Sequence, residues 1–406
     1  MSVIKPFRAL RPHNEFAAQV ASKPYDVLNS EEARKETEGD LLSFLHVTKS
    51  EIDLPADVNL YSNEVYEKAK SNLQKFIDEK VLFQDEQPAY YIYELQWKGR
   101  RQTGLVCASS VKDYFDDVIK KHEFTRPEKE QDRINHMRVI GAQTGNVFLA
   151  CKDIKELNDI FDHWKKHNVA EYDFTAPDGV QHTIWVVNSP ATVDVITNLF
   201  KEKVPFTYIA DGHHRAASAA KVSRELPDSE DAQYFLTTIF PANQLAILDY
   251  NRVVKDLNGL TNEEFLKKLE EDFTVEKSET AVSPARLHQF GLFLGNTWYT
   301  LTAKEGTYKN DPIGVLDVTI LQDNVLSKIL NIQDPRTDKR LDFVGGIRGL
   351  GELEKRVKSA DMKAAFSLYP VSIQQLFDIA DSGNVMPPKS TWFEPKLRDG
   401  LLTHLI

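Results

Sequence analysis

The stretch from Val204 to Val222 constrains the fold more than any other part of the chain. Residues 206–210 are apolar and rich in aromatic and β-branched side chains, which predicts a short buried strand. Residues 216–222 are rich in alanine, which predicts a helix that can pack closely on a sheet. Only the five residues of 211–215 separate the two elements, so the strand must lead directly into the helix.

The five intervening residues are Asp211, Gly212, His213, His214 and Arg215. The first N–H groups of a helix have no partner within the helix, and together with the helix dipole they attract anions. The glycine allows a ligand to approach the backbone, and the arginine offers a planar fork to phosphate oxygens. The histidines and the carboxylate add proton transfer or metal binding. These residues together predict phosphate chemistry.

Two alternatives remain open for the same residues. Asp211 could simply cap the helix, which is worth ~1 kcal/mol, while Arg215 makes a surface ion pair. A zinc site is the second alternative, although His213 and His214 are adjacent and lack the H-E-x-x-H spacing of zinc motifs. No metal ligand set is assigned.

Composition narrows the classes of partner. The net charge of −11 opposes broad binding to nucleic acid or anionic membrane, so we expect neither as a partner. With only two cysteines, Cys107 and Cys151, no disulfide framework is implied. No apolar run approaches the ~20 residues of a membrane span, and the first residues lack a signal-peptide core. A cytoplasmic location is expected.

Predicted strands and helices alternate along the whole chain of 406 residues, which indicates a mixed α/β (α+β) protein. We expect two lobes, residues 1–255 and residues 256–406, with the tail of the second returning to the site. Residues 43–47 predict a strand and residues 63–80 an amphipathic helix. The charged run over residues 124–138 is typical of a solvated helix, or of a flap that brings Arg126, Arg133 or His136 over an anion.

Further candidate residues lie near both ends of the chain. Near the start, Arg8, Lys23 and Asp26 stand beside loops. The glycine-rich residues 345–351 follow a predicted strand and open a helix, which suits a phosphate cradle, but they lack the Walker A ending. A plain tight turn remains the alternative. In the tail, two prolines precede Lys389, Ser390 and Thr391, which favours an ordered segment.

Five motifs together resemble the DUF1015 family. The match runs from Ile4 to Gly400 and depends on the motifs at residues 8–12 (Arg-Ala-Leu-Arg-Pro), 23–27 (Lys-Pro-Tyr-Asp-Val), 210–215 (Ala-Asp-Gly-His-His-Arg), 343–349 (Phe-Val-Gly-Gly-Ile-Arg-Gly) and 386–391 (Met-Pro-Pro-Lys-Ser-Thr). The Asp-Gly-His-His-Arg stretch is also similar to the site of the archaeal ADP-dependent free-serine kinase. That resemblance implies a ParB/sulfiredoxin-like core, elaborated with additional sheets and helices into a two-lobed protein.

Members of this family have been assigned as serine kinases that use inorganic pyrophosphate. The resemblance therefore implies transfer of a phosphoryl group to free L-serine with Mg²⁺, giving O-phospho-L-serine, an entry to cysteine synthesis. Pyrophosphate is the expected donor because no adenine or ribose signature is visible, and ADP or ATP is the alternative. A phosphohydrolase and a ParB-like nucleotide-binding protein associated with nucleic acid are the rival functions.

Roles follow from the resemblance and the chemistry of the side chains. Glu15 lies in Arg11-Pro12-His13-Asn14-Glu15, which is similar to a Lys-Pro-His-Glu motif of the archaeal kinase but one residue longer. The expected catalytic residues are Asp211, His213, Glu15 and Asp26. The expected phosphate-binding residues are Gly212, His214, Arg215, Arg8, Lys23, Arg348, Lys389, Ser390 and Thr391. Which carboxylate is the base, and the oligomeric state, stay open.

Overall fold

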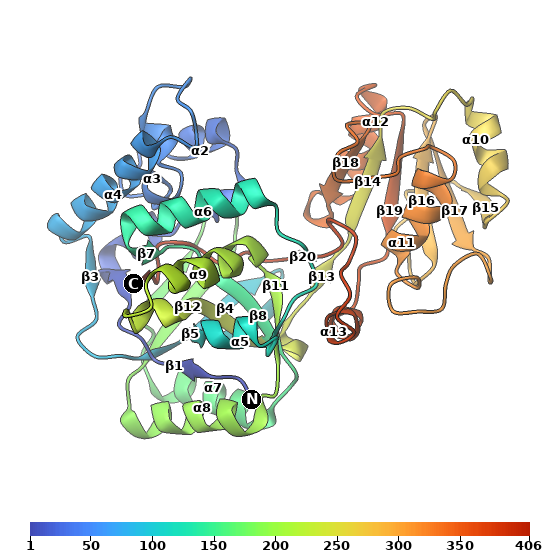
Figure 1. Cartoon of the computed structure of the whole chain (residues 1–406). Helices are drawn as coiled ribbons and strands as arrows, with labels where there is room; N and C mark the ends of the chain where they lie inside the picture. Colours follow the sequence, from blue (N-terminus) through green and yellow to red (C-terminus); the bar gives the residue numbers. More distant parts are fainter. The chain divides into compact units, whose positions relative to one another are not determined.

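The computed structural model describes all of residues 1–406 and shows a mixed α/β protein with several sheets (Figure 1). The fold class expected from the sequence is therefore confirmed. The chain divides into two units, one of Met1–Leu245 with Pro395–Ile406 and one of Ala246–Glu394. The division expected from the sequence, two lobes that meet after residue 255, stays a prediction. No helix is both long and apolar enough to cross a bilayer.

A nine-stranded sheet forms the centre of the first unit. Strand β8 runs parallel to β12, and β11 runs parallel to β6, while all other neighbours are antiparallel. In sheet order the strands are β6 (Ile119–Lys120), β11 (Thr207–Asp211), β8 (Val147–Cys151), β12 (Tyr234–Pro241), β5 (Arg100–Ser110), β4 (Tyr90–Trp97), β10 (Gln181–Val187) and β9 (Tyr172–Thr175), with β1 (Ile4–Lys5) paired to β5.

Helices cover this sheet and bury its apolar side chains. Figure 1 shows α6 lying along α9, and α7 beside α8. The α-helices of the unit are α1 (Ala17–Val20), α2 (Ser30–Glu36), α3 (Leu45–Thr48), α4 (Asn63–Asp78), α5 (Val111–Phe115), α6 (Pro127–Ile140), α7 (Lys155–His167), α8 (Pro190–Lys203) and α9 (His213–Glu225). The 3₁₀ turns are η1 (Asn14–Phe16), η2 (Tyr25–Val27), η3 (Ser50–Asp53), η4 (Asp231–Gln233) and η5 (Ala242–Gln244).

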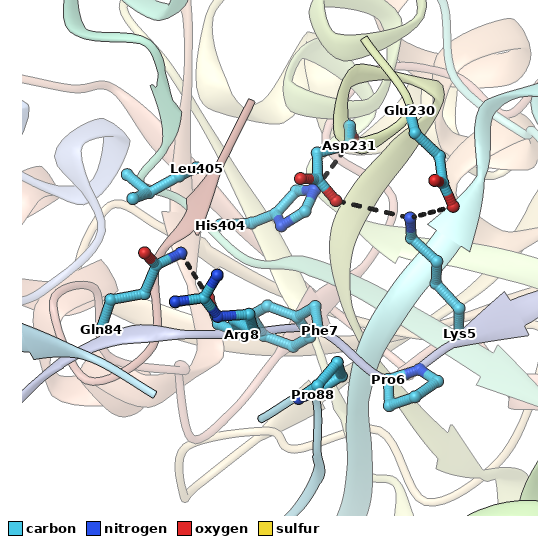
Figure 2. A pocket seen from close by; sticks show the side chains of 10 residues that line it. All are labelled: Lys5, Pro6, Phe7, Arg8, Gln84, Pro88, Glu230, Asp231, His404 and Leu405. Carbon is cyan, nitrogen blue, oxygen red and sulfur yellow. Dashed lines mark hydrogen bonds and ion pairs between the residues drawn. The ribbon is translucent and has the colours of Figure 1, made fainter. Parts of the chain in front are cut away.

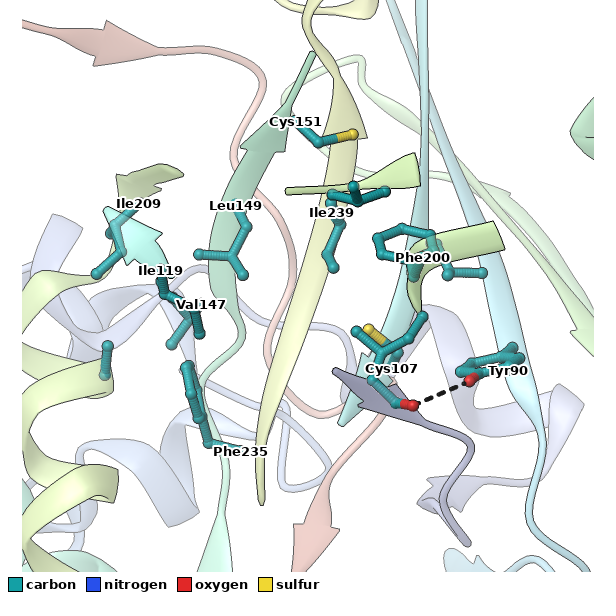
Figure 3. Packing of buried hydrophobic residues seen from close by; sticks show 14 of the residues in the cluster. Tyr90, Cys107, Ile119, Val147, Leu149, Cys151, Phe200, Ile209, Phe235 and Ile239 are labelled. Atoms are coloured by element: carbon teal, nitrogen blue, oxygen red, sulfur yellow. Dashed lines mark hydrogen bonds between the residues drawn. The ribbon is translucent and has the colours of Figure 1, made fainter. Parts of the chain in front are cut away.

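One core cluster joins strands β5, β8, β11 and β12 to helices α7, α8 and α9 (Figure 3). Alternate strand residues such as Val147, Leu149 and Ile239 supply it, as the two-residue period of a strand requires. Both cysteines are free and fully buried in this cluster, and burial raises the pKa of each thiol to about 12. They pack as apolar side chains and are not reactive at neutral pH.

The last residues of the chain are tied into the first unit by backbone pairing. Strand β21 (His404–Leu405) pairs with β7 (Ala142–Gln143), and β2 (Leu10–Pro12) pairs with β3 (Leu82–Gln84). Isolated bridges join Leu10 to Thr403 and Ser22 to Asp399. The tail therefore runs as an ordered segment beside the N-terminal residues.

The second unit contains a six-stranded antiparallel sheet. Its order is β15 (Phe273–Ser278), β17 (Thr297–Ala303), β16 (Gln289–Leu294), β19 (Ala364–Leu368), β14 (Tyr250–Val254) and β18 (Leu341–Gly345). The other elements are β13 (Ile247–Leu248) paired with β20 (Trp392–Phe393), α10 (Asn262–Leu269), α11 (Asp317–Leu321), η6 (Gln322–Ser327), η7 (Gly346–Arg348), α12 (Gly349–Lys358) and α13 (Ile373–Asp381).

Local sequence patterns predict many of these elements and miss some. The strand expected over 206–210 is β11, the helix expected over 63–80 is α4, and the glycine-rich 345–351 does join a strand to a helix. The strand expected over 43–47 is wrong, because α3 (Leu45–Thr48) forms there as a short helix buried on all sides. A short apolar run does not distinguish a buried strand from a buried helix.

Gly400 provides a test of how tightly the tail is packed. It has φ +89°, and an added Cβ would lie 2.6 Å from the Cβ of Phe44. We expect Gly400→Ala to lower the free energy of unfolding by about 2–4 kcal/mol, since both strain and overlap oppose it. Urea denaturation measures this change. Gly99→Ala is the matched control, because Gly99 has φ +76° but nothing within 4 Å of its added Cβ, and an equal loss in both variants would contradict the packing argument.

Candidate functional site

The corner between β11 and α9 has the geometry that the sequence predicts. β11 ends at Asp211, Gly212 takes the left-handed conformation with φ 98°, and α9 begins at His213. Only glycine adopts that conformation without strain. Gly212, not Asp211, occupies the N-cap position of this helix, and it has no side chain to accept a capping hydrogen bond. The first N–H groups of α9 have no partner within the helix, an arrangement that attracts anions.

Arg215 lies in the first turn of α9 and is only 8% exposed. One terminal nitrogen of its guanidinium donates to the backbone oxygen of Asn146. The other, Nη2, lies 3.8 Å from Asp26 Oδ2 and 3.7 Å from Asp211 Oδ1. Hydrogen bonds between charged groups are usually 2.7–2.9 Å long, so both contacts are loose. The buried Nε has no hydrogen-bond partner.

Two glycines make room for this guanidinium. A Cβ at Gly145 would lie 2.9 Å from Arg215 Cδ, and a Cβ at Gly212 would lie 3.2 Å from both Cζ and Nε. Leaving a buried donor unpaired costs about 1–3 kcal/mol, more for a charged group. A buried arginine with a free N–H beside a helix N-terminus is therefore suited to bind an oxyanion.

The charges around Arg215 are fixed by burial and by their neighbours. Burial by itself lowers the pKa of Arg215, but Asp26 and Asp211 raise it, and the net pKa is above the ordinary value. For Asp211 burial by itself raises the pKa, but Lys396 and Arg215 lower it well below its usual range. Lys396 Nζ lies 2.9 Å from Asp211 Oδ2. Asp211 is thus a fixed carboxylate that holds two cations in place.

Both histidines of the motif are neutral, fixed hydrogen-bond acceptors. His213 Nε2 accepts from the backbone N–H of His122 at 3.5 Å, and His214 Nε2 accepts from the backbone N–H of Arg126 at 2.9 Å. Burial is the largest cause that lowers the pKa of each histidine. Neutral rings do not attract phosphate by charge, so their predicted roles require hydrogen bonding instead. No group of three or more histidine, cysteine or acidic side chains gathers to bind a metal ion.

A cavity of about 30 Å³ lies beside Arg215. Tyr25, Arg133 and His136 contribute to its lining. The Arg133 guanidinium stacks on the Tyr25 ring with its carbon 4.0 Å from the ring centroid. Helix α6, which includes most of the charged run over 124–138, thus places two of its three candidate residues next to the site. Their action on a ligand stays a prediction.

Asp399 is a buried carboxylate that the sequence analysis missed. It is 2% exposed, and neither carboxyl oxygen has a hydrogen-bond partner of good geometry. Burial raises its pKa to about 7, with Arg215 lowering it, Asp26 raising it and Arg133 lowering it by smaller amounts. The dipeptide Asp399-Gly400 reads locally as a turn, so no sequence signal points to this role. Only the fold of the tail brings the carboxylate close to Arg215 and Asp26.

The remaining predicted residues of the first unit are dispersed. Asp26 lies on η2 within reach of Arg215, as given above, but Glu15 is exposed on η1. Lys23 pairs with Glu36 at 2.6 Å, and Arg8 Nε donates to the backbone oxygen of Asp85 at 2.8 Å. Roles for Glu15, Lys23 and Arg8 in phosphoryl transfer stay predictions.

Four predicted residues belong to the second unit. Arg348 ends η7 and is exposed, as is Lys389, whose Nζ lies 5.7 Å from the centre of the Tyr250 ring. Ser390 is buried and donates to the backbone oxygen of Pro387 at 2.6 Å, and Thr391 is half-buried. Their predicted contacts with phosphate stay predictions.

Fold and corner together define a mixed α/β protein whose strand-to-helix junction carries the Asp-Gly-His-His-Arg residues. The chain belongs to the family described as protein of unknown function (DUF1015), whose model matches residues 4–319. No curated protein matches the sequence.

Several solved structures are distantly similar in fold. A mutant free serine kinase in complex with AMP has 12% identity and a TM-score of 0.37, with coverage of 73% of this chain and 92% of that one. A conserved hypothetical protein from Pyrococcus furiosus has 14% identity, TM-score 0.36 and coverage of 74% and 94%. SbnI with a C-terminal truncation from Staphylococcus aureus has 10% identity, TM-score 0.37 and coverage of 72% and 85%.

The raised pKa of Asp399 predicts how stability depends on pH. In the unfolded chain an aspartate titrates at ~3.9, whereas in the fold Asp399 titrates at about 7. The folded state therefore holds a proton that the unfolded state has lost, and this group's contribution to stability falls as pH rises from about 4 to about 7. Asp399→Asn removes that loss. We expect its free energy of unfolding to exceed the wild-type value by about 2–4 kcal/mol above pH 7.

Urea denaturation at a series of pH values measures the difference between the two proteins. The difference in the free energy of unfolding should be small near pH 4, grow between about pH 4 and about pH 7, and then level off. Parallel curves for variant and wild type would show that Asp399 is not buried as an uncompensated acid.

Proposed function

We propose that the β11–α9 corner is the active site of a phosphotransferase that moves the terminal phosphoryl group of a diphosphate donor to the hydroxyl of free L-serine. The observation that carries the proposal is the Arg215 guanidinium, buried and charged, with an unpartnered Nε beside the N-terminus of α9. L-serine is the acceptor implied by the similarity of residues 210–215 to the archaeal serine kinase site. The product is O-phospho-L-serine.

Binding of the donor follows from the loose ion pairs of Arg215. Its contacts with Asp26 and Asp211, at 3.8 and 3.7 Å, leave the guanidinium able to turn toward phosphate oxygens. The N–H groups of α9 and the amide of Gly212 would bind the same oxygens. Lys396, fixed by Asp211, adds a second cation close by. Phosphoryl transfer depends on such neutralisation of the phosphate oxygens and on in-line positioning.

The chemical step forms one bond and breaks one bond. The serine Oγ bonds to the terminal phosphorus as the bond from phosphorus to the bridging oxygen breaks, and the leaving phosphate takes that electron pair. The serine hydroxyl proton passes to a carboxylate. Asp211 is a poor acceptor because its pKa is so low, whereas Asp399, with a pKa of about 7, is matched to neutral pH. Asp26, which is exposed and lies near Arg215, is the other candidate for the proton acceptor.

The carboxylates at this corner could hold Mg²⁺ only together with the phosphate groups of a bound donor. It needs one or two protein carboxylates plus phosphate oxygens and water, and not a full protein cage. Asp26 and Asp211 would supply those carboxylates, and the ion would neutralise phosphate charge.

Pyrophosphate and a nucleoside diphosphate share the chemistry that this corner recognises. The sequence shows no adenine or ribose signature, which favours pyrophosphate. The similar solved structures include free serine kinases in complex with AMP and with ADP, and nucleotide donors are therefore tested beside pyrophosphate.

The first test is to incubate the protein and Mg²⁺ with L-serine and, in turn, pyrophosphate, ADP or ATP. Formation of O-phospho-L-serine, followed by ³¹P NMR or mass spectrometry, is the expected result with at least one donor. Release of inorganic phosphate without phosphoserine would instead identify a phosphohydrolase. Absence of turnover with all three donors would contradict the proposal.

Arg215→Ala is expected to lower kcat/KM by about 100-fold or more, because it removes the main positive charge that neutralises the transferred phosphoryl group. The matched control is Arg138→Ala. Arg138 is exposed on the neighbouring helix α6, where it pairs with Glu225. Near-normal turnover in Arg215→Ala, or an equal loss in both variants, would remove Arg215 from the site. Circular dichroism of both variants checks that they fold.

A further inference from the structure

A second and larger cavity, of about 330 Å³, opens elsewhere in the first unit (Figure 2). Its walls come from four separate segments, which are residues 5–8, the end of β3 with the loop after it, residues 230–231 at the start of η4, and β21. None of its lining residues lines the cavity beside Arg215. Its volume is in the range of small-molecule sites, which begins at about 300 Å³.

One end of this cavity is cationic. Arg8 donates its Nε to the backbone oxygen of Asp85, and its two terminal nitrogens contact no acceptor. Gln84 lies beside it and donates its amide to the Arg8 backbone oxygen at 3.4 Å (Figure 2). This end therefore offers a free guanidinium fork, the geometry that binds a carboxylate or phosphate group.

The other end is acidic. Lys5 Nζ lies 3.3 Å from Glu230 and 3.4 Å from Asp231, so two carboxylates share one ammonium group and a negative charge remains. Both carboxylates are well exposed, with 86% and 62% of their side chains accessible, and such pairs bind weakly. An ammonium group of a ligand can therefore be accommodated here.

A buried histidine lies between the two ends, as Figure 2 shows. His404 is 2% exposed, and its Nε2 lies 3.0 Å from the backbone oxygen of Asp231. A carbonyl oxygen only accepts, so Nε2 carries the proton and Nδ1 is an acceptor. Burial lowers the pKa of this ring, which keeps it neutral. Phe7, packed edge-on against His404 at 5.4 Å, provides an apolar wall.

We propose that this cavity, between Arg8 and the Glu230–Asp231 pair, binds a small zwitterion of the amino-acid type whose acid group and ammonium group stand at opposite ends. The acid group would bind to Arg8 and the ammonium group to the two carboxylates, with the carbon chain against Phe7 and the prolines beside it. The inference is independent of the proposed phosphotransferase activity, since this cavity shares no lining residue with the cavity beside Arg215.

A length series of ω-amino acids tests this site with probes of known charge separation. Glycine, β-alanine, γ-aminobutyrate, 5-aminopentanoate and 6-aminohexanoate are titrated into the full chain by calorimetry or NMR. We expect affinity to peak at one chain length, with pentanoate and pentylamine, which carry only one charge each, binding at least about tenfold more weakly. Lack of binding by every zwitterion at millimolar concentration would overturn the proposal.

Variants then place the site. Arg8→Met is expected to lower the affinity for the best-binding zwitterion by about tenfold or more. The double variant Glu230→Gln, Asp231→Asn is expected to have the same effect. Arg101→Met is the matched control, because Arg101 is exposed on β5 and bonds Gln96 outside the cavity. Unchanged affinity in Arg8→Met, or displacement of the zwitterion by pyrophosphate, would overturn the proposal. Thermal melting confirms that each variant is folded.

Discussion

The burial of Arg215 beside two glycines is the constraint on which the rest of the candidate site depends. A guanidinium 8% exposed must remain charged, so it requires carboxylates near it. Asp26 and Asp211 supply that charge at distances too long for good hydrogen bonds, and Nε is left without a partner. An arginine that makes only loose ion pairs and keeps one donor free has hydrogen-bonding capacity left for an anion.

The two ends of the chain meet in the first unit, and the tail brings two charged residues to the corner. Lys396 in the tail fixes Asp211, while Asp399, a few residues further on, is buried among Arg215, Arg133 and Asp26. Backbone bridges between the tail and the N-terminal segment hold both residues there. Burial without hydrogen bonds makes Asp399 costly to ionise, and such costs are typical of functional positions.

The local part of this arrangement is predictable from sequence. The strand and the helix of residues 204–222 follow from periodicity and residue type within one short stretch. Asp399 and Lys396 are not predictable in this way, because long-range pairing alone brings them to the corner. The same reason explains why the sequence could not place Arg8 in a separate cavity, and its predicted role in phosphate binding stays a prediction. The strand expected over 43–47 failed because propensity does not separate short buried strands from short buried helices.

Calorimetric titration of pyrophosphate into the wild-type chain and into an Arg215→Met variant tests the central claim most directly, because it measures anion binding without requiring turnover. Hydrogen bonds to charged groups contribute about 1.5–3 kcal/mol. We predict that the wild-type protein binds pyrophosphate and that Arg215→Met lowers the affinity by about 10- to 100-fold. Equal affinity in the two folded proteins would show that Arg215 does not hold the anion, and would contradict the account.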